Sequence, residues 1–183
     1  WEISRSLVAA VFDSISKIQP ESRIKIVRDI EVMTSDYLIE NIESAFKVWN
    51  RRGVAKHYSF DDFCSYVLPY RVAHEPLSHW RRTALQRYGH WLDSLNAPQD
   101  IARSIAMRYP VRYNAGMTKY PYIMSYEEMD SLQWGTCDDM TAFLTLSLRA
   151  IGIPAATDVV KAWANRSSAH CWNVVKDTAG HFV

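Results

Sequence analysis

The stretch Gly135-Thr136-Cys137-Asp138-Asp139-Met140, with the apolar run that follows it to Gly152, decides how the rest of the chain is interpreted. Gly135 allows a sharp backbone turn, and a threonine followed by two acidic residues is typical of a helix N-terminus. Cys137 therefore lies at the start of a predicted helix, where backbone N–H groups and the helix dipole favour a thiolate. This position predicts a nucleophilic cysteine.

The helix that begins at this cysteine is apolar over most of its circumference, and Gly152 and Pro154 end it. A helix of this kind belongs inside a protein. A buried helix that presents a cysteine at its start is a suitable platform for covalent catalysis. Its polar positions form one line, which consists of Asp138, Thr141, Thr145 and Arg149.

Two strands are predicted after this helix. Residues 154–163 favour the first strand, and residues 169–175 favour the second after a polar turn. Side chains alternate along a strand, so His170 and Trp172 share one face, while Cys171 and Asn173 share the other. We expect the face with His170 to pack on the Cys137 helix, because a thiol beside an imidazole is the minimum unit for acyl transfer.

These residues resemble the transglutaminase-like superfamily. The resemblance spans Gln133–Val183 and is carried by three motifs, which are Gly-x-Cys-x-Asp at 135–139, Leu-Arg-Ala-Ile-Gly-Ile-Pro-Ala at 148–155, and Ala-His-x-Trp at 169–172. It implies an α+β fold with a papain-like core, in which the buried cysteine-bearing helix packs on a small antiparallel sheet. It also implies a Cys-His-Asp triad, with Cys137 as the nucleophile and His170 as the base.

The third triad residue that the resemblance implies is an aspartate on the strand after His170. The sequence reaches only the start of that strand at residues 181–183, so we expect this aspartate beyond Val183 and a core that is truncated at its C-terminal end. Asp177 comes too early and falls in a predicted turn. Loss of the orienting group typically lowers the rate of a triad enzyme by orders of magnitude, because nothing then holds the imidazole tautomer.

Four further residues are candidates for the site. Gln133 and Trp134 closely precede the cysteine, and either can donate to an oxyanion beside the cysteine's backbone N–H. The alternatives are a surface position for Gln133 and a core or cleft-wall position for Trp134. We expect Asp139 to bond the helix N-terminus or the adjacent loop rather than to transfer protons. We expect Trp172 to pack beneath the catalytic imidazole.

The chain is expected to be a single domain over residues 1–183. Residues 1–110 form a mainly helical elaboration, and residues 111–183 form the transglutaminase-like core. The strongest amphipathic pattern runs from Leu77 to Leu95 and predicts one long helix. Residues 111–127 are expected to form an aromatic loop that passes near the cysteine.

A polar cluster lies within the helical part of the chain. Arg71, Glu75 and Arg81 occur close together among aromatic residues. The pattern favours a buried Arg–Glu pair that locks the helical region, and the alternative is a pair of arginines that holds a carboxylate-bearing substrate.

The composition excludes several classes of function. A net charge of +1 gives no electrostatic support for binding nucleic acid or an anionic membrane, and no apolar run approaches a membrane span. Three cysteines give no disulfide framework, and no Cys/His spacing resembles a zinc site, so we expect no metal and no organic cofactor. Because the chain starts at Trp1, we expect its natural N-terminus to be missing, which leaves the compartment open, an extracytoplasmic one included.

Two functions remain open. The first is a cysteine protease, amidase or acyltransferase that cleaves or transfers an amide bond in a peptide, protein or glycopeptide through a thioester, with hydrolysis favoured over transfer. The second is a catalytically inactive transglutaminase-like domain that acts as a peptide-binding, glycan-binding or scaffold module.

Overall fold

A computed structural model describes residues 27–51, 53–108, 111–116, 122–162 and 168–183 of the chain. The sequence pattern also predicts helices at residues 3–18 and 21–33. The first lies outside the described residues, as does most of the second. The described chain begins with a single turn, α2 (Asp29–Val32), followed by α3 (Ser35–Arg51). None of the described helices combines the length and the apolar character that a bilayer span requires.

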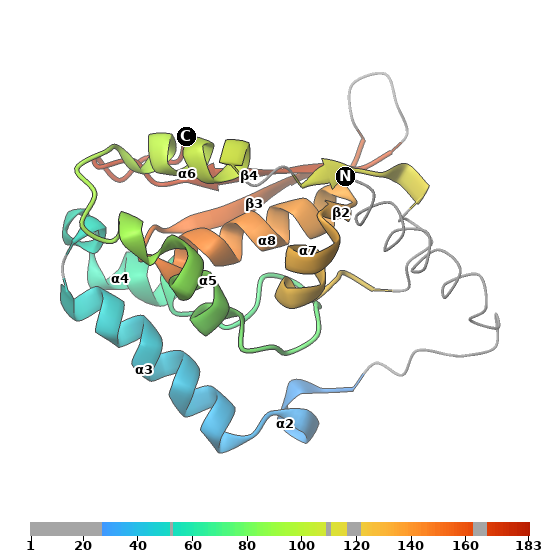
Figure 1. The fold of residues 1–183 in the computed structure, drawn as a ribbon, viewed down its shortest axis with the longest axis horizontal. Coiled ribbons are helices and arrows are strands. Elements are labelled where there is room, and N and C mark those ends of the chain that lie inside the picture. Colours follow the sequence, from blue (N-terminus) through green and yellow to red (C-terminus); the bar gives the residue numbers. More distant parts are fainter. Residues whose placement is uncertain (1–26, 52, 109–110, 117–121, 163–167) are drawn as a thin grey trace.

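The helix α8 (Cys137–Ala150) lies at the centre of the fold, as Figure 1 shows. It contacts α5 (Trp80–Tyr88), α6 (Pro98–Arg108) and α7 (Tyr126–Leu132), as well as the strands described below. Its apolar side chains join the main hydrophobic core, with Leu146 and Leu148 fully buried. The burial of this helix, expected from its sequence, is confirmed.

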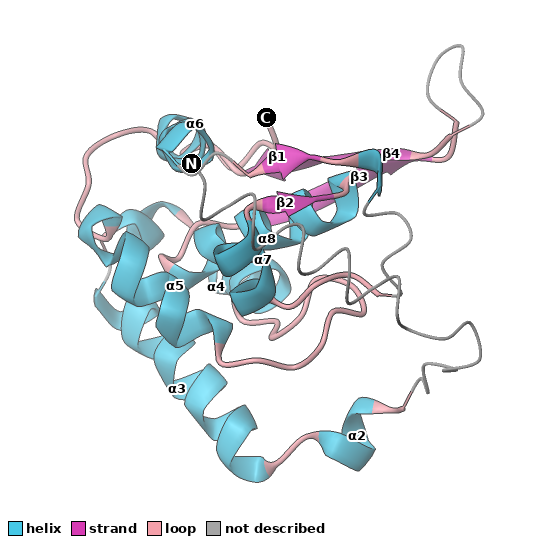
Figure 2. Ribbon diagram, turned by 45° about the vertical axis from the view of Figure 1, so that its right-hand side comes forward, coloured by secondary structure: helices cyan, strands magenta, loops and turns pink. Residues whose placement is uncertain are grey.

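Two small sheets pack against the helices, and Figure 2 shows them in magenta. In the first, β3 (Ala155–Val160) pairs antiparallel with β4 (His170–Val175), and both strands contact α8. In the second, β1 (Arg112–Tyr113) pairs in parallel with β2 (Trp134–Gly135), which leads directly into α8. The helices and small sheets together make an α+β fold.

The chain after β4 starts a third strand beside it. Lys176 forms a bridge with Phe182, and the backbone groups of Val175 and Val183 exchange hydrogen bonds in both directions at 3.1 and 3.0 Å. The predicted turn between these positions is therefore confirmed. Its Asp177 carboxylate accepts hydrogen bonds from the backbone N–H groups of Ala179 and His181.

The remaining helical elements pack beside α3. They are a 3-10 turn (Val54–His57), α4 (Phe60–Asp62) and a π-helical turn (Phe63–Val67). A serine followed three residues later by an acidic residue predicts a capping box at Ser59 and Asp62, and the structure has one there at the start of α4. Asp62 also pairs with Lys176, which ties the helical region to the segment after β4.

The helix predicted for Leu77–Leu95 is shorter than expected. α5 ends at Tyr88, and a 3-10 turn (Gly89–Trp91) follows it. Gly89 follows directly, and glycine is unfavourable inside a helix. The Leu92 carbonyl accepts a hydrogen bond from the Val54 backbone N–H and not from a later residue of the same helix. The prediction was wrong beyond Tyr88 because this long-range contact competes with the continuation of the helix.

The predicted buried Arg–Glu pair is replaced by other partners. Glu75 is buried, and its carboxylate accepts hydrogen bonds from the backbone N–H groups of Val72 and Ala73 at 2.7 and 2.8 Å. Arg71 instead pairs with Asp29 at 2.5 Å. The buried Arg81 guanidinium donates to the side chain of Asn41 and to backbone carbonyls, namely those of Val67, Leu68 and Arg149.

A matched pair of leucines tests the central place of α8. Leu148 is 0% exposed and Leu95 is 94% exposed. We expect Leu148→Ala to lower the free energy of unfolding by about 2–5 kcal/mol, because it leaves a cavity in the core. Leu95→Ala should change it by less than about 0.5 kcal/mol. Urea unfolding followed by circular dichroism measures both, and equal losses would contradict the assigned core.

Candidate active site

Cys137 is the first residue of α8 and is partly exposed. The preceding Thr136 has extended backbone angles, and its hydroxyl accepts the backbone N–H of Asp139 at 3.4 Å. This cap is the one predicted from the sequence. It fixes the thiol at the mouth of a buried helix, where the first-turn N–H groups have no acceptor within the helix.

Asp139 is 3% exposed and holds the helix start in place. One carboxylate oxygen accepts the Thr136 backbone N–H at 2.8 Å and the Thr136 hydroxyl at 2.7 Å. The other oxygen accepts the backbone N–H of Met124 at 2.8 Å, which ties in the loop before α7. These bonds agree with the structural role expected for Asp139.

Gly135 is required by packing rather than by its backbone angles. A Cβ atom at this position would lie 2.7 Å from the Asp139 Cβ and 3.0 Å from the Met129 Sδ. Atoms cannot approach so closely, so a larger residue would displace the carboxylate that caps α8. Gly135 is therefore needed so that Asp139 can keep the position in which it caps α8.

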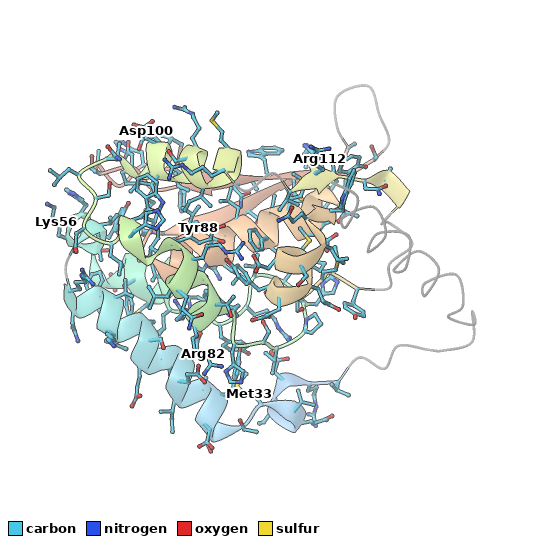
Figure 3. The ribbon with its side chains drawn as sticks, in the orientation of Figure 1. Met33, Lys56, Arg82, Tyr88, Asp100 and Arg112 are labelled. Atoms are coloured by element: carbon cyan, nitrogen blue, oxygen red, sulfur yellow. The ribbon has the colours of Figure 1, made fainter. Side chains whose placement is uncertain are left out.

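Gln133 and Trp134 lie where β1 meets β2. Gln133 is exposed and ends α7 in a left-handed conformation with φ of 57°, and its carbonyl accepts the Arg112 backbone N–H at 2.9 Å. Trp134 is partly buried, and the Arg112 guanidinium lies over its ring, 5.8 Å from the centroid. Figure 3 places Arg112 at the end of the molecule where α8 begins. Trp134 is therefore held on β2 against Arg112, three residues before Cys137.

The face of β4 that packs on α8 carries Cys171 and Asn173. The Asn173 amide donates to the Thr141 carbonyl at 2.9 Å and to the Thr145 hydroxyl at 2.8 Å. The Cys171 sulfur lies 3.5 Å from the Thr141 hydroxyl. The side of α8 with Thr141 and Thr145 therefore faces β4, and Asn173 supplies hydrogen bonds to both residues.

His170 and Trp172 alternate onto the other face of β4, and both are exposed. Their rings lie 6.2 Å apart, centroid to centroid, at an interplanar angle of 38°. The expectation that this face packs on α8 is wrong, because the buried hydroxyl of Thr145 requires a polar partner and Asn173 supplies it. The role of His170 as a general base stays a prediction.

Cys171 takes the position beside Cys137 that was expected for the imidazole. The two sulfurs and an Asp138 carboxylate oxygen all lie within 4.8 Å of one another. The Cys171 thiol lies 3.4 Å from one Asp138 oxygen, and the Cys137 sulfur lies 4.0 Å from the other. Burial, the Cys137 thiol and the Asp138 charge together raise the pKa of Cys171 to about 12, against a lowering by the Thr141 hydroxyl.

These three side chains are also the described donors that could hold a metal ion. Two thiols and a carboxylate suit zinc, but they are one ligand short of the four in a structural zinc site. This proximity was not predicted from the sequence, because strand alternation with His170 turned inward puts Cys171 on the face away from the helix. The signal that could have found it was Asn173, whose amide matches the polar line of a helix that is otherwise apolar.

The capping carboxylate gives a test of the site's framework. Asp139→Asn replaces one of the two carboxylate oxygens with an NH₂ group. That group is a donor and would face a backbone N–H that now donates to the oxygen. We expect a loss of about 1–3 kcal/mol in the free energy of unfolding, measured by urea titration. Asp36→Asn, at an exposed first-turn position of α3, is the control and should cost less than about 1 kcal/mol. Equal effects would contradict the special role of Asp139.

Comparison with known proteins agrees with the motifs on which the site is built. The family model of the transglutaminase-like superfamily matches residues 86–183, just over half of the 183 residues and more than the segment that carries the resemblance. The match begins within α5 and continues through β4. No curated protein and no solved structure matches the chain significantly. The extent of the family match shows that this chain belongs to the transglutaminase-like superfamily.

Proposed function

We propose that the chain is a cysteine enzyme that cleaves or transfers an amide bond through a thioester at Cys137, with hydrolysis favoured. The observation that carries this proposal is the position of Cys137. A partly exposed thiol stands at the capped N-terminus of a buried helix, in a chain of the transglutaminase-like superfamily. A rigid helix that holds a thiol at a surface opening is the arrangement that covalent catalysis requires.

The proposed reaction has two steps. The imidazole of His170 takes the proton of the Cys137 thiol, and the sulfur attacks the carbonyl carbon. The C–N bond then breaks, and the amine leaves with that proton, which the imidazolium returns. Water then gives a proton back to the imidazole and attacks the thioester, which releases the carboxylic acid and the thiol. In the transfer variant an amine replaces the water.

The oxyanion formed in each step requires hydrogen-bond donors. The Asp139 N–H is bound by the Thr136 hydroxyl. We assign the oxyanion to the first-turn N–H groups of Cys137 and Asp138, because a helix leaves such groups without internal acceptors. Trp134, three residues before Cys137 on β2, is kept as a second candidate donor, whereas the exposed Gln133 fits the C-terminal cap of α7 better.

His170 requires a side-chain movement to act as the base. It is the first residue of β4, next to Cys171, whose sulfur lies within 4.8 Å of the Cys137 sulfur. The His170 backbone is therefore at the correct end of α8. We propose that the exposed imidazole turns around the strand end toward the thiol when substrate binds, since catalytic hydrogen bonds often tighten only in the complex.

The third member of the proposed triad follows from the pairing after β4. Lys176 opposes Phe182, and Val175 opposes Val183, so residues that continue this strand would run beside β4 toward His170. An aspartate on that continuation could accept a hydrogen bond from the imidazole and fix its orientation. We therefore keep the expectation of an aspartate beyond Val183 as part of the proposal.

The outward position of His170 favours one alternative, a catalytically inactive binding module. The exposed aromatic side chains near the site would then contact a peptide or a glycan. Trp172 is 39% exposed on the outer face of β4, and Tyr113 is exposed on β1. Amphipathic aromatic rings of this kind are common in binding surfaces.

Alkylation separates the two functions. We expect iodoacetamide at pH 6 to label Cys137 at least about ten times faster than Cys64, although Cys64 is the more exposed residue. Peptide mapping by mass spectrometry assigns the label, and Cys64 is the internal control for an ordinary exposed thiol. Labelling that simply follows exposure would favour the binding module.

His170 gives the second test. We expect His170→Ala to lower kcat/KM for hydrolysis of peptide and glycopeptide amides by about 10²–10⁴-fold, the usual contribution of a general base. His181→Ala is the matched control, because His181 is also exposed and lies on the segment after β4. Identical rates for the two variants would remove His170 from the mechanism. Binding of such peptides without any turnover would support the inactive module.

A further inference from the structure

We propose that Cys171 is the resolving cysteine of Cys137. Oxidation by a peroxide would join the two sulfurs in a disulfide within one chain and block the nucleophile. The formation of this bond goes beyond the proposed function and does not depend on it. Its meaning as a reversible lock on the enzyme rests on the proposed function.

The two sulfurs are already neighbours. Their Sγ atoms lie within 4.8 Å of each other, on either side of the Asp138 carboxylate that both thiols approach. A disulfide requires a sulfur separation of about 2.0 Å, which rotation about the Cα–Cβ bonds of two adjacent cysteines can provide. The bond therefore needs a local adjustment of the two side chains.

Both backbones are held in place on opposite sides of the pair. Cys137 is fixed by the capping box at the start of α8, and Cys171 is fixed in β4 by its pairing with Val159. The Cys171 sulfur points at the helix, where the Thr141 hydroxyl lies 3.5 Å away. The high effective concentration of one thiol at the other favours an internal bond over a bond with an external thiol.

The exposure of the cysteines decides the order of events. Cys137 is partly exposed and can meet a peroxide, whereas Cys171 is 3% exposed. Cys64 is exposed but lies in the π-helical turn of the helical region, on a different element from both. Of the two neighbouring cysteines, Cys137 is therefore the one that peroxide reaches first, and Cys171 is the thiol placed to react with the product.

The chemistry balances with one peroxide. The Cys137 thiolate attacks a peroxide oxygen, the O–O bond breaks, and sulfenic acid and hydroxide form. The Cys171 sulfur then attacks the sulfenic sulfur, the S–O bond breaks, and the hydroxyl leaves as water. The Asp138 carboxylate, 3.4 Å from the Cys171 sulfur, takes the thiol proton and delivers it to the leaving hydroxyl. The hydroxide from the first step combines with the proton that Cys137 released on forming its thiolate. Two thiols and one hydrogen peroxide thus yield a disulfide and two waters.

Peptide mapping of the peroxide-treated protein tests the bond itself. The protein is treated with hydrogen peroxide in the presence of a chelator, alkylated, digested without reductant and analysed by mass spectrometry. We expect a peptide pair that joins Cys137 to Cys171 and that separates on addition of dithiothreitol. Cys64 should remain alkylated. Joining of Cys137 to Cys64, or oxidation of Cys137 with no bridge to Cys171, would overturn the proposal.

Two variants test the assigned roles. In Cys171→Ala, peroxide should carry Cys137 to sulfinic acid, so that dithiothreitol no longer restores its alkylation. In Asp138→Asn, formation of sulfenic acid should continue while closure of the bridge slows several-fold. A wild-type rate of closure in Asp138→Asn would remove the carboxylate from the step. Recovery by dithiothreitol in Cys171→Ala equal to the wild type would refute the resolving role.

The outcome for the bridge is independent of the outcome for catalysis. If peroxide forms the bridge in a protein that hydrolyses no amide, the disulfide proposal holds and the proposed function is refuted. If the protein hydrolyses amides but peroxide forms no bridge, the proposed function holds and the disulfide proposal is refuted. If both hold, activity should fall as the bridged peptide forms and return with dithiothreitol.

Discussion

The two hydrogen bonds from the Asn173 amide to the Thr141 carbonyl and the Thr145 hydroxyl decide how β4 meets α8. A one-residue slip of β4 would turn every side chain to the other face and leave the Thr145 hydroxyl buried without this donor. An unsatisfied buried polar group costs about 1–3 kcal/mol, which is a large share of the stability of an ordinary domain. The face that β4 turns to the helix is therefore set by polar contacts, to which the Cys171 thiol adds its own with Thr141 and Asp138.

This contact also determines what surrounds Cys137. With Asn173 turned inward, Cys171 is turned inward too, and its sulfur shares a small space with the Cys137 sulfur and the Asp138 carboxylate. The neighbouring aspartate has a different task, because the buried Asp139 binds Thr136 and the loop at Met124. Two adjacent acidic residues thus divide into one that holds the helix start and one that faces the thiols.

Local patterns were predictable from the sequence, and contacts between distant segments were not. The caps of α4 and α8 and the turn after β4 follow from short-range chemistry, so the sequence predicted them correctly. The end of α5 depends on Leu92 and Val54, which lie far apart in the chain. The inward face of β4 likewise depends on Thr141 and Thr145. Strand alternation separates the two faces but does not tell which one is buried when both carry polar and apolar residues.

The central claim is that Cys137 and His170 form one reactive unit. The most direct measurement is a crystal structure of the protein after Cys137 has been alkylated by a peptidyl chloromethyl ketone. The account predicts that the His170 imidazole turns around the end of β4 and lies about 2.6–3.2 Å from the sulfur or the oxygen of the adduct. An imidazole that stays against Trp172 on the outer face, with Cys171 as the neighbour of the adduct, would contradict it.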